Sequence, residues 1–66
     1  MRLTPLTVSC NTNGCPAVFL SDSGSIVVQG DHVDRPPAAA RLSPGEALVV
    51  IPRELLLEAV RHLDAL

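Results

Sequence analysis

Two cysteines and a histidine are the residues of this sequence whose types could bind a metal ion. Cys10 and Cys15 are separated by four residues, and His32 follows a predicted hairpin that could fold it back toward them. Zinc sites combine thiolate sulfur and imidazole nitrogen in a tetrahedron, so Cys10, Cys15 and His32 form one candidate zinc site. The fourth ligand would be Asp31, Asp34 or a residue of a second chain.

The same two cysteines have two simpler interpretations. A disulfide between Cys10 and Cys15 would close a short loop, which stabilises a fold little through chain entropy. Alternatively both stay reduced, and one is buried as a small apolar residue. We expect reduced cysteines, no bound metal and no cofactor, because thiols are kept reduced in the cytoplasm.

The remaining polar residues do not form a recognisable catalytic set. Cys15 precedes Pro16 at the start of a predicted strand, with no helix N-terminus that would lower the pKa of its thiol. A nucleophilic cysteine also needs a base and a group that orients the base. His62 lies four residues after Glu58, and a solvated i,i+4 pair accounts for both side chains. We therefore predict that the protein is not an enzyme.

The composition narrows the possible functions further. The chain has 66 residues, which fit one small domain over residues 1–66. It is 47% hydrophobic with a net charge of -2, so disorder is not expected and attraction to nucleic-acid phosphates is weak. With one Phe, no Trp and no Tyr, it lacks the aromatic rings that stack on bases. So small a core usually needs a disulfide, a metal or a partner chain.

The first half of the chain is predicted to be β-structure. Residues 6–9 follow Pro5 and read as an edge strand, where a proline is tolerated. Residues 10–16 read as a loop. Two apolar runs on either side of Asp22-Ser23-Gly24 then predict a β-hairpin over residues 17–29.

The second half is predicted to be a linker, a strand and a helix. The linker covers residues 30–43, and Pro44-Gly45 predicts a type II turn just after it. The continuous apolar run 47–51 predicts a central, well-covered strand. Pro52 suits the first turn of a helix over residues 52–64. The fold class is therefore α+β: a small three- or four-stranded antiparallel sheet with one C-terminal helix packed on a face.

The predicted helix has more apolar positions than one small sheet is expected to cover. Six of them fall within an arc of about 140° and form the predicted core face: Leu55, Leu56, Ala59, Val60, Leu63 and Leu66. Leu57 lies outside this arc, roughly 200° from Leu55. We therefore predict a homodimer or partner interface at Leu57, Arg53, Val49 and Arg61.

The sequence carries no sign of membrane targeting. The residues after Arg2 lack the continuous apolar segment of a signal peptide. The apolar runs 47–51 and 55–57 are far shorter than the roughly 20 residues that span a bilayer. We expect a cytoplasmic protein that does not contact membranes.

The layout of residues 10–63 resembles a group of small actinobacterial proteins encoded beside Xre-type helix-turn-helix regulators, the BldB and WhiJ-associated type. The resemblance follows the order of Cys15–Phe19, Ser25–Asp31, Pro44–Val50 and the helix from Arg53. It implies a non-catalytic interaction module, dimeric in our interpretation, that partners or regulates a helix-turn-helix transcription regulator.

A shorter segment resembles a second group. Val49-Val50-Ile51-Pro52-Arg53-Glu54-Leu55 is similar to a segment of AbrB-like swapped-hairpin transcription factors and MazE-like antitoxins. This resemblance implies dimers that exchange hairpins and bind DNA with arginines, which here would be Arg2, Arg41, Arg53 and Arg61. It is the alternative to the first interpretation, together with the small zinc-binding module.

Overall fold

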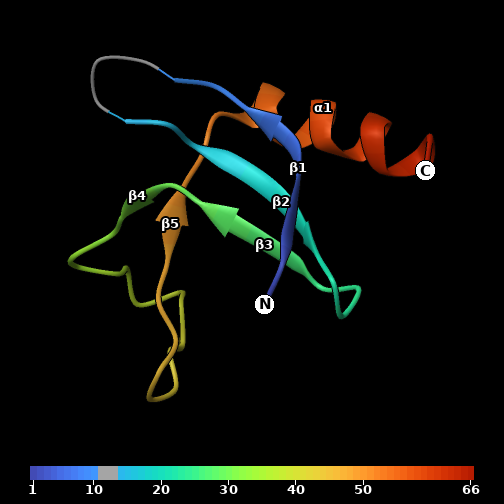
Figure 1. Cartoon of the computed structure of the whole chain (residues 1–66). Helices are drawn as coiled ribbons and strands as arrows, with labels where there is room; N and C mark the ends of the chain where they lie inside the picture. The colour runs from blue at the N-terminus through green and yellow to red at the C-terminus, as the bar shows by residue number, and fades with distance from the viewer. Residues whose placement is uncertain (11–13) are drawn as a thin grey trace.

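The fold is α+β, as the sequence predicts. The structure is a computed structural model that describes residues 1–10 and 14–66. Its elements in chain order are β1 (Leu3–Val8), β2 (Ala17–Ser21), β3 (Ile26–Gln29), β4 (Asp31–His32), β5 (Val49–Val50) and α1 (Arg53–Asp64) (Figure 1). The first three strands form an antiparallel sheet, and β4 and β5 form a second, two-stranded sheet.

The predicted hairpin over residues 17–29 is present as β2 and β3. Val18 pairs with Val28 and Leu20 with Ile26. The connecting turn is closed by the amide of Gly24, which donates to the carbonyl of Ser21 over 3.0 Å. Gly24 has φ of 89°, the left-handed conformation that ends a three-residue hairpin loop. Local sequence signals therefore set this hairpin.

The predicted edge strand is β1, which pairs only with β2 in the order β1-β2-β3. It begins at Leu3, earlier than the predicted start at residue 6. The register shifts between Pro5 and Thr7, so Leu6 forms a bulge and its side chain is buried. The predicted loop 10–16 follows β1, and its residues 11–13 lie outside the described residues.

The segment from residue 31 to residue 50, which we call the arm, differs most from expectation. The start of the predicted linker forms β4 and pairs with β5, which lies in the predicted strand 47–51. Asp31 pairs with Val50, and His32 pairs with Val49. The predicted strand 47–51 is only two residues long, and both valines are exposed, so a central, covered strand was the wrong interpretation. An apolar run shows that a strand is possible but not which segment pairs with it. The arm projects away from α1 (Figure 1).

The turn at the end of the arm was predicted correctly. The amide of Glu46 donates to the carbonyl of Ser43 over 3.0 Å. Gly45 has φ of 87°, as the third position of a type II turn requires. A side-chain oxygen of Glu46 also accepts from the amide of Ser43 over 2.7 Å, which reinforces the turn.

Helix α1 lies on one face of the sheet, mainly on β1 and to a lesser extent on β2. It begins at Arg53 rather than at Pro52, because Pro52 keeps the extended ψ of 140° and acts as the N-cap. The core beneath the helix is formed by Leu6, Val18 and Ala59, with Leu20 and Ile51 packed against them. No helix among residues 1–10 and 14–66 is long and apolar enough to cross a membrane.

Candidate interaction surface

The buried face of α1 is narrower than the sequence predicts. Only Leu55 and Ala59 of the helix are buried. Four positions of the predicted core face are exposed instead: Leu56, Val60, Leu63 and Leu66. The reason is that a three-stranded sheet supports one side of a helix, whereas the apolar residues of α1 continue round its surface. We call Leu56, Val60 and Leu63 the α1 flank; they are 48%, 47% and 38% exposed.

Beside the α1 flank, part of the sheet is uncovered. Paired residues of neighbouring strands share a face, so Ile26 and Val28 lie on the same face as Leu20 and Val18, which pack under the helix. Ile26 and Val28 are nevertheless exposed. We call these two residues the β3 strip. The strip was not predicted from the sequence, although three consecutive apolar residues in a strand place apolar side chains on both of its faces.

The opposite side of α1 is polar and anchored to β1. The Nδ1 atom of His62 bonds the backbone carbonyl of Leu6, the residue in the β1 bulge. The Nε2 atom of His62 lies 3.9 Å from Oε1 of Glu58, which confirms the predicted i,i+4 pair. The pair with Glu58 does not explain the position of His62 completely. Its contact with Leu6 also links two residues that are 56 positions apart in sequence.

The four predicted interface residues lie on two separate elements. Arg53, Leu57 and Arg61 are spaced by four residues on α1 and share one side of the helix. Leu57 is 50% exposed. Val49 is also exposed but belongs to β5 in the arm. Three of the four residues therefore form one stripe, and Val49 belongs to a different surface.

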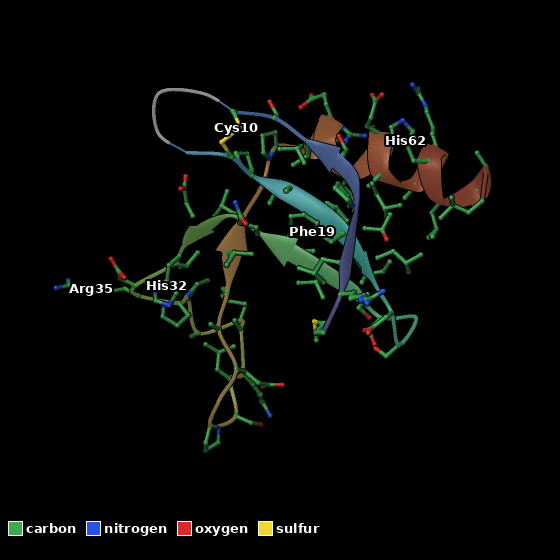
Figure 2. The ribbon with its side chains drawn as sticks, in the orientation of Figure 1. Cys10, Phe19, His32, Arg35 and His62 are labelled. Atoms are coloured by element: carbon green, nitrogen blue, oxygen red, sulfur yellow. A yellow bond between two sulfur atoms is a disulfide. The ribbon has the colours of Figure 1, made fainter. Side chains whose placement is uncertain are left out.

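The three residues of the candidate zinc site are not brought together. Cys10 and Cys15 form a disulfide, so the expectation of reduced cysteines was wrong for this structure. The β1–β2 ladder explains the bond, because Val8 pairs with Ala17 and the strands bring the two cysteines opposite each other. His32 lies on the arm (Figure 2). Its Nδ1 is 2.9 Å from Oδ1 of Asp34. Among residues 1–10 and 14–66, no three potential ligands gather as for a metal ion.

Two open depressions lie on the surface of the described residues. One, of about 460 Å³, lies between the disulfide and the arm, and Asp31 is the one titratable side chain among its lining residues. Gln29 donates across its edge to the carbonyl of Cys15 over 2.6 Å. The other follows the seam of β1 and α1 and contains His62 with Glu54 and Glu58. Neither depression joins a nucleophile to a base by a hydrogen bond among the described residues.

Comparison with known proteins identifies no relative of this chain. No protein-family model, no curated protein and no solved structure matches the chain. The surface of α1 and β3 is therefore the feature from which a function can be inferred.

Proposed function

We propose that this protein is a small non-catalytic interaction module that works as a homodimer and binds or regulates a helix-turn-helix transcription regulator. The observation that carries the proposal is the row of half-exposed aliphatic side chains on α1. Soluble monomers rarely expose contiguous apolar patches of this kind, and such patches mark sites of protein association.

The total exposed area supports association. The chain exposes 5245 Å², whereas a compact monomer of 7.0 kDa exposes about 4,000 Å². Part of this difference belongs to the projecting arm. The rest of the difference of about 1,200 Å² is surface that a second chain could cover, and each partner in a standard interface buries roughly 800 Å².

The partnership with a regulator rests on the resemblance in layout to proteins encoded beside Xre-type regulators. A module of this type needs no DNA contacts of its own, which agrees with the net charge of -2.

Light scattering on the purified chain tests the dimer. We expect a mass of twice 7.0 kDa at micromolar concentration. A chain that stays at 7.0 kDa would contradict the dimer. The proposal expects a gene for an Xre-type regulator beside the gene of this chain, and titration against that purified regulator tests the partnership. A neighbouring gene of another kind, or absence of binding, would contradict that part of the proposal.

A further inference from the structure

We propose that the outer edge of β3, the side away from β2, binds an extended segment of a partner protein as an additional antiparallel strand. β3 is the last strand in the order β1-β2-β3 and lies at the border of the sheet (Figure 1). Addition of a strand to a free sheet edge is a recurrent way in which proteins bind peptides. This binding goes beyond the proposed homodimer and regulator, because it uses the backbone of β3 and not the surface of α1.

The backbone groups of Ile26 and Val28 point away from β2. In an antiparallel ladder, hydrogen-bonded pairs alternate with pairs that are not hydrogen-bonded. The amide of Ser21 donates to the carbonyl of Ser25 over 2.9 Å, so Val27, two residues further on, also lies in a hydrogen-bonded pair. The amides and carbonyls of Ile26 and Val28 therefore face outward. An antiparallel strand beside β3 would bond all four groups through two of its own residues.

The other edge of the sheet, β1, is blocked against such pairing, whereas β3 is not. Proteins protect exposed strand edges with proline, bulges, charges or a covering element. β1 contains Pro5 and the bulge at Leu6, and His62 of α1 bonds the carbonyl of Leu6. The sequence of β3 is Ile-Val-Val-Gln, and its register with β2 is regular. It has no proline, bulge or charge, so the edge of β3 is open to a further strand.

The surroundings of β3 define the residues that the added strand should carry. Its residues opposite Ile26 and Val28 would lie on the same face as the β3 strip. Because the strip is apolar and exposed, aliphatic side chains fit these two positions. Asp22 precedes β3 and Asp31 follows it, and both are exposed. Basic residues at the two ends would complement these carboxylates, so the partner segment is an extended strand with alternating aliphatic residues and basic ends.

The synthetic peptide Lys-Thr-Val-Thr-Val-Thr-Lys tests this binding by two-dimensional NMR of the isotope-labelled protein. On titration, the amide signals of Ile26 and Val28 should shift and their hydrogen exchange should slow, because both amides become bonded. N-methylation of both valines removes the donors that face β3 and should weaken binding about tenfold or more. Methylation of the two outer threonines, whose amides face away from β3, should leave binding unchanged. Glutamate in place of both lysines should weaken binding.

A proline at Val28 tests the same bonds from the protein side. Val28→Pro removes an amide hydrogen that β2 does not accept, so the β2–β3 ladder keeps its bonds while peptide binding should be lost. Val49→Pro is the matched control on the arm, since Val49 is 41% exposed and Val28 38%. The amide of Val33 donates to the carbonyl of Leu48, so the next pair, Val49 with His32, is not hydrogen-bonded. Val49→Pro should bind the peptide as the wild type does.

Several results would overturn this inference. They are absence of peptide binding, equal binding after methylation of the valines, and unchanged binding by Val28→Pro. Slow hydrogen exchange at Ile26 and Val28 without peptide would also overturn it, because a second copy of the chain would then occupy the edge. A monomeric wild type that binds the peptide would contradict the proposed homodimer and leave the binding edge of β3 standing.

Discussion

At the residue scale, single contacts connect segments that are distant in the chain. His62 joins the helix to the β1 bulge through the carbonyl of Leu6. Gly30 performs a similar role between the main sheet and the arm. A Cβ atom at Gly30 would overlap the carbonyl oxygen of Val50 and lie 2.8 Å from Cγ2 of Ile51. The absent side chain is what lets the backbone of the arm approach β3 closely.

Gly30→Ala should therefore lower the free energy of unfolding by about 1–3 kcal/mol, the usual cost of forcing atoms into filled space. Urea denaturation measures the loss. Gly45→Ala is the control, because a Cβ there meets open space and only the φ of 87° is strained, at a cost of about 1 kcal/mol. A smaller loss at Gly30 than at Gly45 would contradict the close approach.

At the element scale, the sequence predicted where strands and the helix form better than it predicted which strands pair with each other. The hairpin of β2 and β3 and the helix were predictable because turn residues and apolar periodicity are local signals. The pairing of β4 with β5 was not predictable, because it joins residues that are distant in sequence, such as Asp31 and Val50, which are 19 positions apart. The exposure of Leu57 was predicted, whereas the exposure of the α1 flank and of the β3 strip was not. The α1 flank was assigned to the core, because periodicity gives the direction of a face but not the width of the sheet that covers it.

The disulfide should stabilise the end of the β1–β2 ladder. In the chain-entropy model, a loop of this length contributes about 2 kcal/mol, so the double variant Cys10→Ser, Cys15→Ser should lose about that much unfolding free energy. Dithiothreitol should lower the melting temperature of the wild type and leave the double variant unchanged. Two thiols that react with iodoacetamide in the native, unreduced protein would contradict the bond.

The arm should be the first part of the chain that a protease cuts. Exposed loops are preferred sites of proteolysis, and Arg41 and Leu42, on either side of the bond, are exposed. Among the internal arginines, trypsin should therefore cleave first after Arg41. Arg35 is protected because a proline follows it, and Arg53 and Arg61 lie within helix α1. Mass spectrometry of early fragments identifies the bond. Arg41→Gln should slow the digestion, and initial cleavage inside α1 would show that the arm is protected.

At the scale of the whole molecule, the arginines are spread over separate elements and the chain is less compact than a globular domain of its length. The arginines that the antitoxin resemblance would require are distributed over the N-terminus, the arm and α1: Arg2, Arg41, Arg53 and Arg61. The radius of gyration is 12.9 Å, compared with about 10.8 Å for a compact chain of this length. The molecule thus exposes an extended surface without a concentrated positive charge.

Duplex DNA should consequently bind weakly or not at all. Fluorescence anisotropy with a labelled duplex at low salt should show no saturable binding at micromolar protein, because few phosphate counterions would be released. Binding that weakens steeply as salt rises would contradict this expectation and favour the swapped-hairpin alternative. Arg53→Ala combined with Arg61→Ala would then show whether α1 contacts the DNA.

The small core of the single chain has a consequence for the amount of protein in the cell. In the proposed homodimer, folding and pairing would draw on the same helix, so mass action would link the folded fraction to the total concentration. Newly made chains below the dissociation constant would spend more time unfolded and meet proteases there. The protein would then accumulate only above a threshold rate of synthesis. Above that threshold, a given fold increase in synthesis would raise the amount of folded protein by a larger factor.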